Sequence, residues 1–395
     1  MSLLALEQAQ ERLLALAPEL GSETVPSDRA LGRVLAAGCT ARRAQPPFDV
    51  SAMDGFALRG HGPWRCVGES RAGAPFEGAL EPGQCTRIST GAAMPDGADR
   101  VLIREDAAVE HDRVSTAADP VPGQHVRKRG FDFGVGERVL ASGEVITPAR
   151  LALALASGHG ELPVVRATRV AVIECGDELA RDPADCAPHQ VPACNGAMVA
   201  GLLAPLACEV ERLGPVGDDP AALARSLEEA RYADIVITIG GASVGDHDHV
   251  RGALADWGAN IAFWKVAIKP GKPLLVASRQ AGEQHQVVLG LPGNPVSSFV
   301  TAFLFALPLV RRANGMADTL PESEPAILGE DLPATGTRRS FLRGIWSAGE
   351  VRLAASQDSS ALHALARANC LIDRPAGAAP SATGDTVRVL RLQNG

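Results

Sequence analysis

Residues 233–249, ADIVITIGGASVGDHDH, contain the strand and loop that determine the fold of this chain. They start with the apolar run Ile235–Ile239, which is interrupted only by Thr238. Short runs rich in β-branched residues and ended by Gly-Gly are typical of strands buried on both faces of a parallel sheet. Gly240 and Gly241 allow a sharp turn and a close approach of the backbone to a ligand. Open α/β sheets bind ligands where such strands end, so we expect a binding crevice here.

Polar side chains follow this strand in the next loop. Ser243 supplies a hydroxyl, and Asp246 and Asp248 supply carboxylates. His247 and His249 alternate with the aspartates, but an H-x-H pair alone is a weak indication of a transition metal. Magnesium fits better, because it takes one or two carboxylates together with the phosphate oxygens of a substrate.

Strands and helices alternate from Pro163 onward, which is typical of a parallel sheet with crossover helices. The expected strands are residues 169–173, 235–239, 261–266, 273–277 and 287–291, and the expected helices are 195–206, 221–230, 250–258 and 296–311. Turns after three of the strands bring Glu178, Asp248 and the Pro-Gly-Asn-Pro loop at 292–295 to one edge of the sheet. This convergence favours a site over ordinary turns.

The flanking parts of the chain have different patterns. A helix is expected at 3–16, a short strand at 32–40 and a helix at 147–157, where Thr147 and Pro148 suit the first turn. Short strand signals separated by Gly and Pro predict a small inserted β-rich domain, with strands at 65–67, 84–88, 100–103 and 110–115. Beyond Glu322, strands at 339–346, 351–354, 371–373 and 386–392 and a helix at 360–367 predict another β-rich domain, which we treat as accessory.

Composition limits the classes of partner. The chain has 395 residues, enough for two or three domains at about 150 residues each. Its 38 basic and 46 acidic residues give a net charge of −8, whereas nucleic-acid-binding domains are normally basic. Aromatic residues make up only 4%, which leaves little surface for stacking on bases. We therefore expect no nucleic-acid partner.

The expected location is cytoplasmic. The eight cysteines include no C-x-x-C pair, so they read as reduced structural thiols. The first residues lack the layout of a signal peptide, and the longest apolar stretch, residues 300–310, is too short to span a bilayer. No membrane partner is expected.

Two lysines provide the clearest anion-binding signal. Lys269 and Lys272 lie in KPGKP, where two prolines stiffen the loop and Gly271 lets it turn. Two cations on a stiff loop suit phosphate or another oxyanion, although solvated surface lysines are an equally good alternative. Backbone amides after Pro295, with Ser297 nearby, offer a further anion seat. The Walker and GxGxxG patterns are absent from the sequence, so dinucleotide binding is not indicated.

Two further candidates have ordinary explanations. Asp54 precedes a glycine, and such an aspartate is usually a turn residue. The cations at 127–129 are usually a solvated surface, or they reach an anionic ligand or a partner subunit, and Asp132 could pair with them.

Eight motifs then occur together in one order: MDGFA, TGAAMPDGAD, the R-x-x-G-x-D pattern of RKRGFD, CGDEL, GDDP, GGASVGDHD, AFWKVAIKPGKP and GLPGNPVS. With these motifs the chain resembles the molybdopterin molybdenumtransferases, the MoeA/gephyrin E-domain family. The resemblance runs from about residue 9 to residue 392.

The resemblance implies a multidomain α/β fold. It comprises a central three-layer α/β domain resembling molybdopterin adenylyltransferases (166–316), an inserted β-rich domain (46–129), an extended helical and linker region (1–45 with 130–165) and a C-terminal β-barrel (317–395). It also implies an elongated homodimer, in which the central domain of one subunit and the inserted domain of the other form the cleft.

The implied reaction inserts molybdate into adenylylated molybdopterin and releases AMP, with Mg²⁺ as cofactor. The family's acidic and hydroxyl site residues are matched by Asp54, Thr90, Asp132, Glu178, Asp218 and Asp248. The implied binding residues are Gly240, Gly241, Ser243, Lys269, Lys272, Pro292, Asn294, Pro295 and Ser297, and the implied metal ligands are Asp54, Asp246 and Asp248.

The sequence departs from the family pattern at a few positions. The usual Asp-[Ser/Thr]-Asn is Ala193-Cys194-Asn195, the usual Thr before Gly-Asp-Glu-Leu is Cys175, and the usual Tyr after Met-Asp-Gly is Phe56. A paralogue with altered activity, an adenylyltransferase and a non-catalytic scaffold therefore remain alternatives. The sequence does not identify the preferred metal oxyanion, an adenylyltransferase that would hand over the substrate, or the molybdoenzymes that would accept the product.

Overall fold

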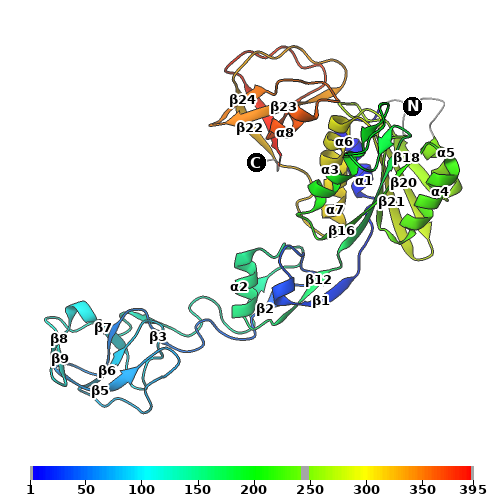
Figure 1. Cartoon of the computed structure of the whole chain (residues 1–395). Coiled ribbons are helices and arrows are strands. Elements are labelled where there is room, and N and C mark those ends of the chain that lie inside the picture. Colours follow the sequence, from blue (N-terminus) through cyan, green and yellow to red (C-terminus); the bar gives the residue numbers. More distant parts are fainter. Residues whose placement is uncertain (1–2, 242–248, 393–395) are drawn as a thin grey trace.

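A computed structural model describes residues 3–241 and 249–392. The molecule is elongated (Figure 1). A small β-sheet lies at one end, and an α/β sandwich with a β-barrel beside it lies at the other. A narrow linker that contains β1 (Ser22–Pro26), β12 (Glu161–Val165) and α2 (Pro148–Ala156) connects the two ends. The predicted division into α/β, inserted β, linker and barrel parts is confirmed.

The central sheet has the order β16-β13-β17-β21-β20-β18. Its strands are β13 (Thr168–Cys175), β16 (Cys208–Val216), β17 (Ile235–Ile239), β18 (Asn260–Trp264), β20 (Leu275–Ala281) and β21 (Gln284–Leu291). The first four strands in this order are parallel. The strand β16 was not predicted; it lies at an edge, and its alternating charged residues do not form an apolar run.

The prediction of an all-parallel sheet is wrong at residues 273–277. There β20 runs antiparallel to β21, with Ala281 paired to Gln284 across a two-residue turn. A parallel pair needs a crossover of a dozen or more residues, whereas two residues suffice for a hairpin. The consequence is that the start of β20, rather than its end, reaches the carboxyl edge of the parallel strands.

Helices cover both faces of this sheet, which gives the predicted three layers (Figure 1). Side chains alternate along β17, so that Ile235, Ile237 and Ile239 join one core and Val236 joins the other. Helices α4 (Pro220–Glu229) and α5 (His249–Asp256) pack on the side of Val236. On the other side lie α1 (Leu6–Leu14), α3 (Asn195–Leu203), α6 (Pro295–Thr301) and α7 (Leu307–Ala313).

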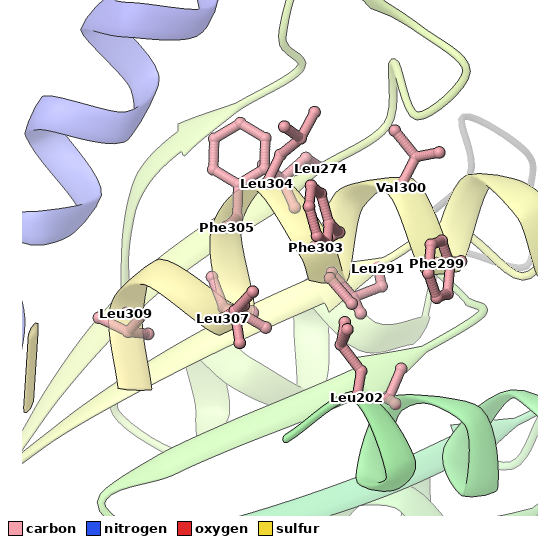
Figure 2. Packing of buried hydrophobic residues seen from close by; sticks show 14 of the residues in the cluster. Leu202, Leu274, Leu291, Phe299, Val300, Phe303, Leu304, Phe305, Leu307 and Leu309 are labelled. Atoms are coloured by element: carbon pink, nitrogen blue, oxygen red, sulfur yellow. The ribbon is translucent and has the colours of Figure 1, made fainter. Parts of the chain in front are cut away.

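The larger core surrounds one continuous helix, Pro295–Ala313, whose phenylalanine and leucine side chains interdigitate with Leu202, Leu274 and Leu291 (Figure 2). A π-helical segment at Ala302–Ala306 separates α6 from α7. Pro308 cannot donate the usual backbone hydrogen bond to residue 304, which accounts for the altered winding before it.

This helix is longer than the apolar stretch seen in the sequence. The helix has 19 residues, and an 18-residue window within it has a mean hydropathy of 1.4, so length and composition alone would allow a membrane span. The helix is 89% buried inside the fold, and Gln10 of α1 donates a hydrogen bond to the carbonyl oxygen of Leu304 at 2.9 Å. Its apolar surface is therefore explained by the protein core.

The inserted sheet has the order β7-β4-β6-β5-β9-β8. Its strands are β4 (Gly55–Leu58), β5 (Trp64–Ser70), β6 (Gln84–Ile88), β7 (Arg100–Ile103), β8 (Ala108–Glu110) and β9 (Arg113–Ser115), and β3 (Val50–Ser51) pairs separately with β10 (Val126–Arg127). The single strand predicted at 110–115 is wrong, because His111, with φ at 57°, starts a turn that makes β8 and β9 a hairpin. The sequence also gave no indication of β4.

The linker is held by short pairings. β1 pairs with β12, and β2 (Cys39–Thr40) pairs with β11 (Arg138–Leu140). Of the strand predicted at 32–40, only β2 forms. The Thr147 side chain caps α2 as predicted by accepting a hydrogen bond from the backbone of Arg150.

The C-terminal region is a closed barrel, as predicted. Its strands are β22 (Ser323–Leu328), β23 (Arg339–Ser347), β24 (Glu350–Leu353), β25 (Cys370–Arg374) and β26 (Thr386–Arg391), and the helix α8 (Leu362–Arg367) packs beside them. The ring closes because β23 pairs with both β24 and β25. The two-residue strand β19 (Ile268–Lys269), which precedes β20 in the chain, adds to β23, so that Lys269 pairs with Ser340.

Candidate functional site

A cavity of about 920 Å³ lies at the carboxyl edge of the parallel strands. Loops that follow four neighbouring strands line it: Gly176 and Glu178 after β13, Asp218 after β16, Gly240 and Gly241 after β17, and residues 292–295 after β21. The predicted convergence of the Glu178 turn with the Pro-Gly-Asn-Pro loop is therefore observed. We call this space the edge crevice.

Two glycines shape its floor. Gly240 and Gly241 have φ values of +87° and +64°. A Cβ at Gly240 would collide with the carbonyl oxygen of Cys175, and one at Gly241 would press on Val250. Both positions thus need glycine for conformation and for space.

Two carboxylates of the edge crevice are exposed. Glu178 and Asp218 have no ion-pair partner in the part of the chain that the structure describes. The Asp218 backbone N–H donates to Oδ1 of Asp177 at 2.9 Å, which ties the two loops together. The Val191 N–H donates to the Glu178 carbonyl, so that β15 (Val191–Pro192) steadies the Glu178 loop. These carboxylates remain available for a ligand, a cation or water.

Two of the departures from the family pattern lie here. Cys175 and Cys194 line the crevice. Burial raises the pKa of the Cys175 thiol to about 12, and the charges of Asp218 and Glu174 add to the rise. Burial likewise raises the pKa of Cys194. Both thiols are therefore neutral near pH 7, and since the thiolate is the metal-binding form, they are poor ligands.

Asn195 holds the Pro-Gly-Asn-Pro loop in place. Its Nδ2 donates to the carbonyl oxygen of Gly293 at 2.7 Å. Asn294 occupies the N-cap position of α6, its Nδ2 donates to Oγ of Ser359 at 3.2 Å instead of capping the helix, and Pro295 occupies the first turn. The crevice loop is thereby bonded both to α3 and to the barrel region. Pro292 is buried and lines the crevice.

The lysine loop faces a second cavity, of about 570 Å³, between the α/β part and the barrel. Lys269 and Lys272 line it together with Ser297, which was expected near the same anion. Pro273 lines both this cavity and the edge crevice, so the two spaces are neighbours. We call the second space the lysine cavity.

The barrel supplies residues that the sequence did not single out. Arg338, Arg343 and Ser359 line the lysine cavity, and Ser360 and Leu362 line the edge crevice. Arg343 is 1% exposed, and burial lowers the pKa of its guanidinium. Only the folded arrangement brings these residues to the lysines, and the barrel region thereby forms part of the walls of both cavities.

Asp54 and Thr90 form a third group, on the inserted sheet. Oδ1 of Asp54 accepts hydrogen bonds from the Thr90 N–H at 2.6 Å and from its hydroxyl at 3.0 Å. These bonds, the backbone one first, hold the pKa of Asp54 below its usual value. Within one chain, the inserted sheet lies at the opposite end from the edge crevice (Figure 1).

The suggested pairing of Asp132 with the cations at 127–129 is not found. Lys128 Nζ instead lies 2.7 Å from a carboxylate oxygen of Asp49, whose other oxygen accepts the Arg129 N–H at 2.9 Å. Asp49 is brought close when β3 pairs with β10, whereas the exposed Asp132 uses its backbone N–H to bond to Gln45.

The remaining predicted residues, Ser243, Asp246 and Asp248, lie outside the described residues. Across residues 3–241 and 249–392, no three His, Cys, Asp or Glu side chains form a group able to hold a metal. The pair Glu178 and Asp218 nevertheless suits Mg²⁺, which takes one or two carboxylates plus substrate phosphates rather than a complete protein cage.

The fold and the crevice define a multidomain α/β protein with a cavity at its sheet edge, to which a barrel and an inserted sheet are attached. Three family models match the chain: "MoeA N-terminal region (domain I and II)" at residues 4–158, "Probable molybdopterin binding domain" at 171–312 and "MoeA C-terminal region (domain IV)" at 325–392. The chain belongs to the MoeA family.

Relatives cover nearly its whole length. It is 34% identical to molybdopterin molybdenumtransferase of Nostoc sp., over 95% of this chain and 91% of the relative. It is 36% identical to molybdopterin molybdenumtransferase 2 of Mycobacterium tuberculosis, over 93% and 95%. A crystal structure of a molybdopterin biosynthesis MoeA protein from Pyrococcus horikoshii superposes with a TM-score of 0.85 at 26% identity, covering 99% of this chain and 100% of the other.

Proposed function

We propose that this chain is an enzyme of molybdenum cofactor biosynthesis that inserts molybdate into adenylylated molybdopterin and releases AMP. The observation that carries the proposal is the contact between two cavities of complementary character. The edge crevice presents Glu178 and Asp218, and the lysine cavity presents Lys269 and Lys272, with Pro273 as a shared wall.

The lysine cavity suits the small oxyanion. Molybdate is doubly charged, and four cationic side chains, Lys269, Lys272, Arg338 and Arg343, line the cavity of about 570 Å³ together with one carboxylate, Asp358. Charge-assisted hydrogen bonds from ammonium and guanidinium groups are stronger than neutral ones. Holding molybdate there would place it next to a ligand in the edge crevice, and proximity would supply much of the rate.

The edge crevice suits the larger pterin nucleotide. Its volume is within the range of small-molecule sites. Glu178 or Asp218, by taking a proton from water, would let the water oxygen add to the nucleotide phosphorus. The anhydride P–O bond then breaks, AMP leaves with the added oxygen, and the terminal phosphate stays on molybdopterin.

A divalent cation belongs to this proposal. Mg²⁺ would neutralise negative charge on the phosphate oxygens. Asp246 and Asp248, with Asp54, stay the expected ligands, and Glu178 and Asp218 are suitable additional ones. Ser243 stays an expected ligand-binding residue.

The active form would be a homodimer. In one chain, the inserted sheet that carries Asp54 and Thr90 lies at the far end from the α/β sandwich (Figure 1), so a second copy would have to supply these residues. Large apolar side chains are exposed where the inserted sheet joins the linker: Phe48 is 50%, Phe131 73% and Val135 60% exposed. Such exposed apolar surface is typical of a protein interface.

Related parts of the proposal concern location and organisation. The relatives and the burial of the only candidate span in the described residues favour a cytoplasmic protein. We also propose boundaries at 1–45 with 130–165, 46–129, 166–316 and 317–395. A molybdopterin adenylyltransferase that delivers the substrate and molybdoenzymes that accept the product are fitting partners.

One turnover assay tests the activity. Purified protein is incubated with adenylylated molybdopterin, Mg²⁺ and molybdate, and AMP and active cofactor are both measured. AMP release that depends on molybdate, together with active cofactor, supports the proposal. Binding without turnover would indicate a scaffold, and synthesis of the adenylylated pterin from ATP would indicate an adenylyltransferase.

A further inference from the structure

The inserted sheet has a cavity of its own, of about 510 Å³, which we call the inserted-sheet cavity. Strands β5, β6 and β7 end at the same edge at which β4 begins, because β4 is antiparallel to β6 and β7, and β5 is parallel to β6. This topology collects Glu69, Arg87, Ser89 and Arg104 around Asp54. Side chains from four strands therefore face one space.

Backbone contacts hold together the edge of the inserted sheet at which Asp54 lies. The Arg104 N–H donates to the carbonyl oxygen of Asp54 at 3.1 Å, which holds the end of β7 against the start of β4. A Cβ at Gly55 would collide with the carbonyl oxygen of Leu102, so this close approach needs glycine. Arg104 is thereby placed directly beside Asp54, and its charge adds to the Thr90 bonds in lowering the pKa of that carboxyl.

The two arginines of the cavity are not held in ion pairs among the described residues, although two acids, Asp54 and Glu69, share the lining with them. Neither Arg87 nor Arg104 has an ion pair in the described part of the chain, although the protein has a net charge of −8. Glu69 is the other acid of the cavity, and it lies 3.6 Å from Arg71 instead. One oxygen of Asp54 is already bonded to Thr90. Both guanidinium groups therefore line the cavity outside any ion pair among the described residues, with Arg104 beside Asp54.

We propose that Arg87 and Arg104 bind the phosphate groups of the nucleotide substrate beside Asp54. The inference rests on the proposed function and names two residues that bind the substrate from the inserted sheet. The inserted sheet would then bind the phosphoanhydride of the substrate in addition to providing Asp54.

The chemistry of the two residues supports phosphate as the ligand. A guanidinium offers a planar fork of donors that matches two phosphate oxygens, and it keeps its charge at any working pH. The anhydride carries two adjacent phosphates, so each arginine has a partner. The Asp54 carboxylate would repel the negatively charged phosphates, and the positive charges of the two guanidinium groups offset that repulsion.

The test compares Arg87→Gln and Arg104→Gln with Arg71→Gln, which removes an equal charge from the same sheet but from a guanidinium paired with Glu69. KM for adenylylated molybdopterin should rise about tenfold in each of the first two, the loss expected for one charged hydrogen bond. KM for molybdate should stay within about twofold, because the lysine cavity is untouched. Arg71→Gln should match the parent protein in both constants.

A second measurement does not depend on turnover. The purified proteins are titrated with adenylylated molybdopterin in the absence of molybdate. Arg87→Gln and Arg104→Gln should bind it more weakly than the parent protein and Arg71→Gln do. Arg87→Lys should fall between the parent and Arg87→Gln, because it keeps the charge and loses the fork. Both guanidiniums are exposed, so thermal unfolding should be unchanged in all variants.

The outcomes separate this inference from the proposed function. Unchanged KM and affinity for the pterin nucleotide in Arg87→Gln and Arg104→Gln, with an active parent protein, would overturn the inference alone. Equal losses in Arg71→Gln would also overturn it, because the effect would then be general charge attraction. A parent protein that binds the nucleotide through these arginines but releases no AMP would overturn the proposed activity and leave the binding role intact.

Discussion

The same hydrogen-bonded pair occurs in two regions of the molecule. In the inserted sheet, Oδ1 of Asp54 accepts the N–H and the hydroxyl of Thr90 at 2.6 and 3.0 Å. In the barrel, Oδ1 of Asp331 accepts the same two groups of Thr383 at 2.7 and 2.9 Å. Both carboxyl groups are exposed, and the bonds from threonine hold the pKa of each below its usual value. The pair itself is therefore a local structural device.

The surroundings distinguish the two regions. Asp54 lines a cavity together with two arginines that form no ion pair among the described residues. Asp331 joins the segment after β22 to the segment before β26, where it connects two loops of the barrel. The comparison teaches that the hydrogen bonds within such a pair do not by themselves indicate function, and that the side chains around the pair have to be compared as well.

The largest expected effect separates the two aspartates. Asp54→Asn should lower AMP release by about 10³-fold, as expected when a carboxylate that handles a proton or a cation is lost. Asp331→Asn, which alters the matching hydrogen bonds, should leave the rate within about twofold. Initial rates at saturating substrate measure both. Similar losses in the two variants would show that the pair acts through stability alone.

The second prediction tests whether Asp54 acts across a subunit boundary. Asp54→Asn and Glu178→Gln should each be nearly inactive alone. After the two are mixed and allowed to exchange subunits, about a quarter of the parent activity should return, because half of the dimers are mixed and each of these has one intact site.

Light scattering should show a dimer throughout this experiment. If subunits exchange but activity does not return, Asp54 and Glu178 do not act in one shared site across the subunit boundary. Asp54 would then have only the local structural role that Asp331 has.

The third prediction concerns the other cationic site. Lys272→Ala should weaken molybdate binding about tenfold, because it removes a charged donor from the lysine cavity. Lys128→Ala removes the same charge where the ammonium is already paired with Asp49, so it should change molybdate affinity less than about twofold. Calorimetric titration with molybdate measures both. Equal affinities for all three proteins would mean that the lysine loop does not hold the oxyanion.

The smallest expected effect is a change in the pKa of Asp54 and of Asp331, and it should be similar for the two residues. Thr90→Val and Thr383→Val remove the hydroxyl donor, so the pKa of Asp54 and of Asp331 should rise toward the unfolded value. Each pair stabilises the fold above the unfolded pKa and loses this contribution as the pH falls through the lower folded pKa, so the variants should lose less stability in acid. Carboxyl NMR titrations measure the shift, and an unchanged pKa in either variant would contradict the assigned cause.

Much of the fold followed from local patterns. The apolar run Ile235–Ile239 identified a buried central strand, and Thr147 with Pro148 marked the start of α2. The direction of β20 was missed because strand composition does not encode orientation, and only the short turn to β21 determines it. The edge strand β16 was missed because its charged residues mask the pattern of a strand.

The site was predictable where turns lie at one sheet edge. Glu178 and the Pro-Gly-Asn-Pro loop could be placed together, since carboxyl ends of parallel strands meet. Arg343 and Ser359 could not, because they are distant in sequence and reach the lysines only through the position of the barrel. Arg87 and Arg104 gave no signal either, since an exposed arginine becomes informative only when the residues around it in the fold are known.

The strand β19 has a consequence for any shortened form of this protein. Lys269 belongs to the lysine loop, yet its backbone is the outer strand added to β23 of the barrel. A chain cut before residue 317 would keep every helix and strand of the α/β sandwich and still leave that lysine without the scaffold that fixes its position. Molybdate affinity would then fall although the pterin crevice stays whole, so the C-terminal module is inseparable from oxyanion capture.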